Sequence, residues 1–196
     1  ITDSITHWTV PRLMKLALKR SLVLALIIGI STLSFPRNVI AVQFDQKEVD
    51  QERFVAIAVP RAFGHTLVVV EQISDSRPCW SESGNQPTLV DPLLLNFDFT
   101  GICGRATDSN GYSVRMAGTD LALSHALSVQ STPNDIVLVA QSRANVTAPP
   151  IIIGRSYGFT NGFAKIILEP GWRLTKRVYQ GKTLGHIYFT SDSPAL

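Results

Sequence analysis

Residues 121–130 read LALSHALSVQ, and apolar and polar side chains alternate through most of this stretch. Successive side chains of a β-strand point to opposite faces of the sheet, so a period of two is typical of a strand with one buried face. The stretch therefore predicts a half-buried strand. Its apolar face would hold Leu121, Leu123, Leu127 and Val129.

Further runs rich in β-branched, leucine or aromatic residues lie on both sides of this stretch, about every 10–15 residues. Almost no helical period separates them, which is typical of an antiparallel β-sandwich or barrel-like domain and not of βαβ units. Asn110-Gly111 and Asn161-Gly162 are expected to supply the positive φ of tight hairpins. The expected strands cover residues 54–59, 66–73, 93–99, 121–130, 136–140, 151–153, 164–168, 172–179 and 184–190.

One short helix is expected ahead of these strands. Asp45 can cap it, and Glu48 can reach back to the capping residue as in a capping box. Phe44 and Val49 stand where a hydrophobic staple places its two residues. The helix should end before Phe54.

The stretch from Met14 to Ala41 is typical of a secretory signal. Lysines and an arginine open it, an almost wholly apolar run follows over residues 21–35, and Val39-Ile40-Ala41 offers a cleavage site. The alternative is a membrane anchor, but the apolar run of about 15 residues is shorter than the roughly 20 that a spanning helix needs. We therefore expect the segment to be cleaved.

This interpretation divides the chain at residue 41. Residues 1–41 would comprise an upstream extension and a cleaved signal peptide, with Met14 as the initiator, and residues 42–196 would form one mainly β domain without a stable membrane span. The expected destination is the periplasm or the extracellular space, with a thylakoid lumen as a further possibility.

The charge balance of the expected mature domain differs from that of the whole chain. The chain carries a net charge of +3, but residues 42–196 hold 13 basic and 14 acidic residues. The positive charge therefore belongs to the segment that would be removed. We predict no nucleic-acid partner, because that prediction would need a basic domain.

Cys79 and Cys103 are the two cysteines of the chain. An exported chain meets an oxidising compartment, where a lone pair of cysteines usually joins. Neither a C-x-x-C motif nor a histidine at ligand spacing favours redox or metal chemistry instead. We predict a structural disulfide, which leaves neither sulfur free as a nucleophile.

Residues 154–158, GRSYG, match the G-x-S-x-G pattern of a nucleophile elbow around Ser156. That elbow requires a helix after the serine, and then an acid followed by a histidine. Here turn residues follow, and His186 precedes Asp192. Ser156, His186 and Asp192 are thus weak candidates, and we predict no catalytic residue.

The sequence offers two metal-site hypotheses, a three-histidine site and an EF-hand calcium loop. Histidines 65, 125 and 186 could meet only through the fold, and Asp108-Ser109-Asn110-Gly111 lacks the flanking oxygen ligands of an EF-hand. A calcium site that uses Asp98, Asp108 and Asn110 stays open as an alternative. We predict no metal and no cofactor.

Basic and aromatic residues gather in residues 172–182. In a strand, Arg173, Arg177 and Tyr179 would share one face, and Trp172 would lie on the other. Such residues can bind an anionic polymer, with a ring that stacks on a sugar or a base. The alternative is a solvated strand face that discourages edge pairing. We name Trp172, Arg173, Arg177 and Tyr179 as candidate binding residues.

Five stretches carry a resemblance: DPLLLNFDFTGICGR at residues 91–105, FVAIA at 54–58, DSNGY at 108–112, GWRLTKR at 171–177 and LGH at 184–186. They resemble a family of exported cyanobacterial proteins that carry a domain of unknown function. The resemblance covers most of residues 42–196. It implies an exported protein and implies no activity, cofactor or catalytic residue.

The function that the sequence favours is a non-catalytic binding or structural domain of the envelope or periplasm. Its expected partner is cell-wall polymer or another exported protein. The alternatives are a hydrolase that acts on wall or extracellular polymer, and a structural subunit of a larger exported or lumenal complex.

Overall fold

The computed structural model describes residues 43–195, so the expected signal at residues 1–41 lies outside the described residues. The domain is mainly β, as predicted, and contains two short 3₁₀ helices. Within residues 43–195, no helix has the length and apolarity that crossing a bilayer requires. The elements are β1 Asp45–Glu48, η1 Gln51–Arg53, β2 Phe54–Pro60, β3 His65–Gln72, β4 Ser81–Ser83, β5 Leu89–Asp91, η2 Leu93–Asn96, β6 Cys103–Ala106, β7 Tyr112–Met116, β8 Thr119–Asp120, β9 His125–Ser131, β10 Ile136–Ser142, β11 Ile151–Arg155, β12 Ala164–Leu168, β13 Trp172–Tyr179 and β14 Lys182–Ser191.

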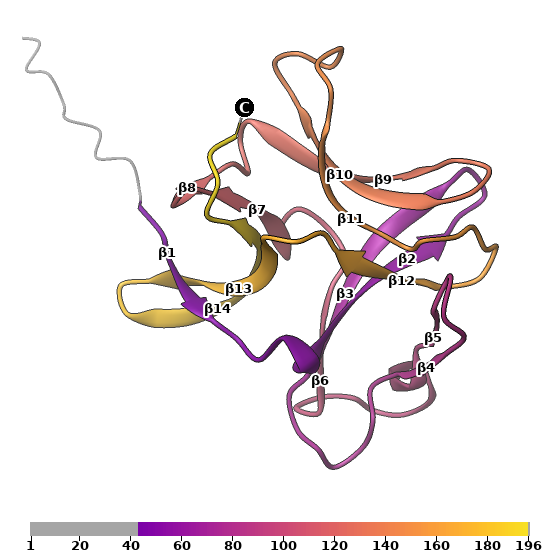
Figure 1. The fold of residues 1–196 in the computed structure, drawn as a ribbon. Helices are drawn as coiled ribbons and strands as arrows, with labels where there is room; N and C mark the ends of the chain where they lie inside the picture. Colours follow the sequence, from indigo (N-terminus) through magenta and orange to yellow (C-terminus); the bar gives the residue numbers. More distant parts are fainter. Residues whose placement is uncertain (1–42, 196) are drawn as a thin grey trace, which may run out of the picture. The chain divides into compact units, whose positions relative to one another are not determined.

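Six antiparallel strands close into a barrel in the order β2-β3-β9-β10-β11-β12, because β12 pairs with both β11 and β2 (Figure 1). The β11–β12 contact that completes the ring is short: Gly154 pairs with Leu168, and Arg155 pairs with Ile167. A Cβ atom at Gly154 would lie 2.7 Å from the Ile167 carbonyl oxygen, so the two backbones approach as closely as they do because this residue is glycine.

A second sheet, in the order β1-β13-β14-β7-β8, forms a half-barrel beside the first (Figure 1). Its neighbours are antiparallel except for β14 and β7, which are parallel. Apolar residues of both sheets form one core, to which the barrel contributes Ala56, Val69 and Leu138 and the second sheet contributes Val114 and Phe189. The predicted barrel-like fold is therefore confirmed, with a half-barrel added to it.

Strand β2 is buried on both faces. Phe54, Ala56 and Ala58 point to the barrel core, whereas Val55 and Ile57 belong to a second apolar cluster outside the barrel wall. The chain between β3 and β6 covers that outer cluster, and it is held by the predicted Cys79–Cys103 disulfide. We call this segment, residues 73–102, the β3–β6 excursion. Because it covers the outer face of β2, the run FVAIA is apolar throughout and does not alternate.

The expected helix that Asp45 would cap is wrong. Asp45–Glu48 form β1, which pairs with β13 from Asp45 opposite Val178 to Glu48 opposite Thr175. A single 3₁₀ turn, Gln51–Arg53, follows; its cap is Asp50, whose carboxylate accepts from the Glu52 amide at 3.1 Å. Pairing with an open sheet edge satisfies more backbone groups than one isolated helical turn can.

Two expected strands also differ. Residues 93–99 contain the 3₁₀ helix η2 in place of a strand, with Leu94 buried against the outer cluster. The alternating stretch at residues 121–130 is a strand only from His125, because Leu121 to Ser124 form a turn in which Leu123 is 95% exposed. The alternation was therefore a true strand signal for half of its length.

The tight hairpins lie elsewhere than expected. Positive φ occurs at Ala117-Gly118 between β7 and β8, and at Gln180-Gly181 between β13 and β14, and does not occur at the two Asn-Gly pairs. Two successive residues with positive φ suit a two-residue hairpin whose twist matches its strands. Asn110-Gly111 instead joins β6 to β7, which pair with different neighbours.

Replacing Gly154 by alanine should lower the free energy of unfolding by about 1–3 kcal/mol, because the added methyl would overpack against β12 at the closure. Chemical denaturation measures this change. Gly185→Ala in β14 is the matched control, since a Cβ there meets no atom within 4 Å. Equal stability of the two variants would contradict the steric account of barrel closure.

Removing the disulfide with Cys79→Ala and Cys103→Ala should lower the free energy of unfolding by about 3–4 kcal/mol, the chain-entropy value for a loop of this length. Denaturation of the oxidised protein and of the double variant gives the difference. Reduction of the wild-type protein should reproduce it. A loss well below about 1 kcal/mol would show that the excursion holds together without the covalent link.

Candidate functional site

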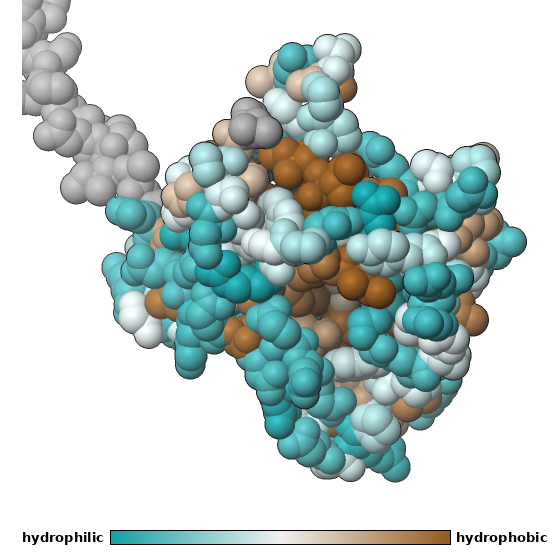
Figure 2. Space-filling model, in the orientation of Figure 1, coloured by the Kyte–Doolittle hydropathy of each residue, from teal (hydrophilic) through white to brown (hydrophobic). Residues whose placement is uncertain are grey.

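An open groove of about 580 Å³ lies where the barrel wall meets the edge of the second sheet. Strands β2 and β12 form its floor, β13 and η1 border one side, and the segment around β4 borders the other. Apolar residues gather in a hollow near β12 on this face, and hydrophilic residues surround them (Figure 2). Ile166, Leu168 and Leu174 contribute apolar surface to the groove.

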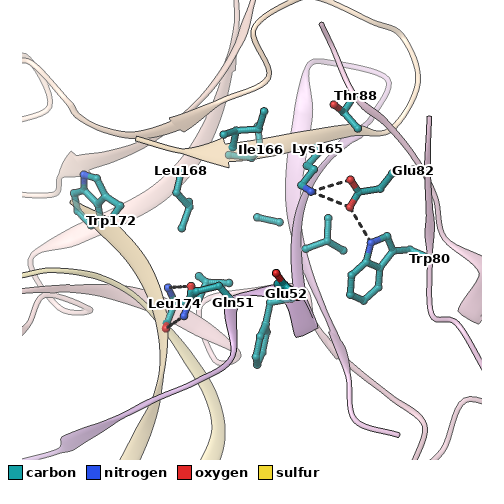
Figure 3. A pocket seen from close by; sticks show the side chains of 14 residues that line it. Gln51, Glu52, Trp80, Glu82, Thr88, Lys165, Ile166, Leu168, Trp172 and Leu174 are labelled. Atoms are coloured by element: carbon teal, nitrogen blue, oxygen red, sulfur yellow. Dashed lines mark hydrogen bonds and ion pairs between the residues drawn. The ribbon is translucent and has the colours of Figure 1, made fainter. Parts of the chain in front are cut away.

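Two half-buried tryptophans stand at opposite ends of the groove (Figure 3). Trp172 opens β13 directly after Gly171, whose φ of +88° lets the chain turn sharply out of β12. Trp80 follows the disulfide residue Cys79, and its indole Nε1 donates to Glu82 Oε1 at 3.0 Å. Both rings are thus anchored, one by the core and one by the disulfide and a hydrogen bond.

Charged side chains line the groove near Trp80 (Figure 3). The Lys165 ammonium donates to both carboxylate oxygens of Glu82, at 2.9 and 2.8 Å, and this pair also fixes the oxygen that holds Trp80. Glu52 lines the groove as well, and its carboxylate makes no ion pair with any residue in 43–195. The groove therefore carries a carboxylate in excess of its lysine.

The Gln51 side chain completes the wall of the groove beside Trp172. The Gln51 amide accepts from the Leu174 N–H at 2.8 Å and donates to the Leu174 carbonyl at 2.9 Å (Figure 3). It thereby continues the β1–β13 ladder past the end of β1. This contact ties η1, and with it Glu52, to the second sheet.

Of the four predicted binding residues, Trp172 alone lines the groove. Arg173 lies on the outer face of β13, where its hydrogen bonds to Glu48 and Asp192 raise the pKa of its guanidinium. Tyr179 is partly exposed and packs against Phe44, with ring centroids 5.5 Å apart. The structure thus separates the tryptophan from the basic residues named with it.

Arg177 belongs to a buried polar network under the second sheet. Its guanidinium donates to Asp120 Oδ2 at 2.7 Å and to the Tyr188 hydroxyl at 2.6 Å, and Tyr188 donates to the same Asp120 oxygen at 2.8 Å. A buried charge is stable when it is paired and hydrogen-bonded in this way. Within the described residues, the half-buried Arg177 side chain is therefore fully engaged by partners of its own sheet.

The three weak catalytic candidates do not meet. Ser156 is fully buried; its Oγ accepts from the Ile136 N–H at 3.1 Å and donates to the Gly158 carbonyl at 2.6 Å. His186 lies in the network just described, and Asp192 is bound to Arg173. No hydrogen bond joins any two of them within residues 43–195, and a loop follows Ser156 where an elbow needs a helix.

His186 has two fixed partners. Its Nδ1 lies 2.8 Å from the Asn110 carbonyl oxygen, and its Nε2 lies 2.8 Å from the Ser113 hydroxyl. The carbonyl can only accept, so Nδ1 carries the proton and the neutral ring accepts from Ser113 through Nε2. Burial lowers the pKa of His186, and the neighbouring Arg177 charge lowers it further, against the raising effects of Asn110 and Asp120.

The remaining histidines and acids of the two metal hypotheses have local partners. His65 lies 2.7 Å from the Ser131 hydroxyl and His125 lies 2.9 Å from that of Ser124. The carboxylates of Asp98 and Asp108 accept backbone N–H groups two residues on, as in Asx-turns. Among residues 43–195, no three His, Cys, Asp or Glu side chains gather as metal ligands would.

Most groove residues were missed from sequence. Among the missed residues, Trp80 had a signal in the sequence, because it directly follows a disulfide cysteine. An aromatic residue in that position is held firmly even in a loop. Glu52, Glu82 and Lys165 look like ordinary surface charges in the sequence. Glu82 and Lys165 are separated by 83 positions, so no local pattern indicates their contact.

Acid should destabilise the protein through His186. Its folded-state pKa is lowered, so the unfolded state binds more protons as the pH falls below about 6.5, and the free energy of unfolding falls with it. Melting temperatures between pH 8 and pH 5 measure this slope. His186→Gln should flatten it, while His125→Gln at the start of β9 should not. An unchanged slope in His186→Gln would contradict the argument.

Comparison with known proteins gives one match. No curated protein and no solved structure matches the chain. The model of the family described as "Protein of unknown function (DUF3747)" matches residues 21–194. The predicted membership of an uncharacterised family is thereby confirmed, while the cyanobacterial source stays a prediction. Since the match spans most of the chain, the protein belongs to the DUF3747 family.

Proposed function

We propose that this protein is an exported, non-catalytic domain that binds a glycan of the cell envelope in the groove between Trp80 and Trp172. The observation that carries the proposal is the placement of two anchored indoles at opposite ends of one open groove. The disulfide supports an oxidising compartment outside the cytoplasm.

The groove suits a saccharide because its two kinds of surface match those of a sugar ring. An indole offers a broad apolar face for the C–H face of a pyranose, and it loses little conformational entropy when it is already fixed by its neighbours. Glu52, Glu82, Lys165 and Thr88 also line the groove and present hydrogen-bonding groups for hydroxyl and acetamido substituents. Because the groove is open, it can admit the middle of a polysaccharide chain as well as its end.

The charge of the groove limits which class of polymer it can bind. Its acidic residues exceed its lysine by one, and the arginines of β13 are paired with carboxylates elsewhere. Like charge disfavours a polyanion at this surface. The groove therefore favours a neutral glycan backbone, such as the N-acetylated amino-sugar strands of peptidoglycan, over the anionic polymer that the basic residues of β13 first indicated.

The oxidised protein should co-sediment with purified peptidoglycan sacculi, and Trp172→Ala and Trp80→Ala should each weaken this binding about tenfold, the effect of losing one stacked ring. Binding isotherms from pelleted fractions give the dissociation constants. Tyr179→Ala is the matched control, because it removes an aromatic ring of the same sheet that lies outside the groove.

The soluble fraction of the same experiment separates the alternatives. Binding without release of sugar or peptide supports the proposal, whereas steady release would identify a hydrolase. Pelleting that all three variants retain would place the contact outside the groove. Absence of pelleting would reject the wall glycan and favour a protein partner or a structural role in a complex.

A further inference from the structure

A second cavity, of about 260 Å³, lies on the outer face of the barrel wall and shares no lining residue with the groove. Side chains of β2 and β3 form its floor, notably Ile57, Val59 and Val68, and η2 forms its rim with Leu94 and the 61% exposed Leu95. The surface is apolar over most of its area. Most of these lining residues belong to the outer cluster, and the β3–β6 excursion that packs over the cluster leaves this cavity beside η2.

Two arginines line this cavity, Arg61 and Arg105. Arg61 follows Ile57 and Val59 at the two-residue spacing that places side chains on one face. Arg105 on β6 lies opposite Val70 on β3, another lining residue, and its guanidinium lies 5.7 Å from the centre of the Phe99 ring. None of the described residues that line the cavity is acidic.

These two arginines differ from four other arginines of the domain, which bind carboxylates. Arg53, Arg155, Arg173 and Arg177 all form ion pairs with carboxylates. Within residues 43–195, no ion pair of Arg61 or Arg105 exists. An apolar cavity with two unmatched cations at its border is complementary to one class of ligand, which has a hydrocarbon body and an anionic head.

We propose that this cavity binds a single-chain anionic amphiphile, with the hydrocarbon chain against Ile57, Val59 and Val68 and the head group at Arg61 and Arg105. The volume lies just under the roughly 300–1,000 Å³ of ordinary small-molecule sites, so it accommodates part of one chain and not a two-chain lipid. A carboxylate and a phosphate head share the required chemistry, because arginine pairs with both in the same geometry.

This site is independent of the glycan groove. The two cavities share no lining residue. Loss of glycan binding in Trp172→Ala would therefore leave the amphiphile site intact, because Trp172 packs against the barrel core and not against the outer cluster. Conversely, replacing the two arginines would leave the glycan groove intact.

The test is displacement of 11-(dansylamino)undecanoate from the oxidised protein by dodecanoate, dodecyl phosphate and dodecanol, each below its micellar concentration. We expect both anions to displace the probe, and the double variant Arg61→Gln, Arg105→Gln to weaken them at least tenfold while dodecanol changes less than twofold. Dodecanoate and dodecyl phosphate together show which head group is preferred.

Two further variants make the result decisive. Arg77→Gln is the matched control, because Arg77 also lies over a phenylalanine, at 5.1 Å from the Phe97 centre, but does not line the cavity. Val68→Phe should fill the cavity and weaken all three ligands, with thermal unfolding to verify that the variant is folded. Failure of the wild-type protein to bind the probe, or equal weakening by Arg77→Gln and the double variant, would overturn the proposal.

Discussion

The closure of the barrel by β12 is the constraint on which the rest of this structure depends. Two residue pairs join β12 to β11, and the absence of a side chain at Gly154 allows the backbones to meet. Arg155 reinforces the seam through ion pairs with Glu169 and Asp135. Strand β12 also pairs with β2 and with β5. This one strand therefore connects the barrel, the disulfide-linked excursion and the groove floor.

Both proposed sites follow from which side of the barrel wall remains uncovered. A strand has two faces, and the core covers only the inner one. The excursion packs on the outer face of β2 and β3 but leaves the amphiphile cavity between these strands and η2. The groove arises where β13 of the second sheet approaches β2 and β12 of the barrel, and Gln51 and the two tryptophans are among its lining residues.

The sequence predicted the fold class because the strands carry their own signals. Residues 164–168 and 172–179 were expected as strands with the bounds that β12 and β13 have. The disulfide was expected from the presence of two cysteines in a chain with a predicted export signal. The errors at Asp45 and at residues 93–99 have one cause. Local patterns indicated a helix and a strand there, whereas an open edge of β13 and the outer cluster determined what formed.

The candidate sites were less predictable because their residues come together only through long-range pairing. Spacing placed Trp172, Arg173, Arg177 and Tyr179 in one strand, but a bulge between Lys176 and Val178 and the carboxylates of other elements decided what each side chain contacts. Arg177 became part of a buried network, whereas Arg61 and Arg105, which no pattern distinguished, remain unmatched beside apolar surface. In this fold, a basic residue is informative about ligands only once the acids that could neutralise it have been located.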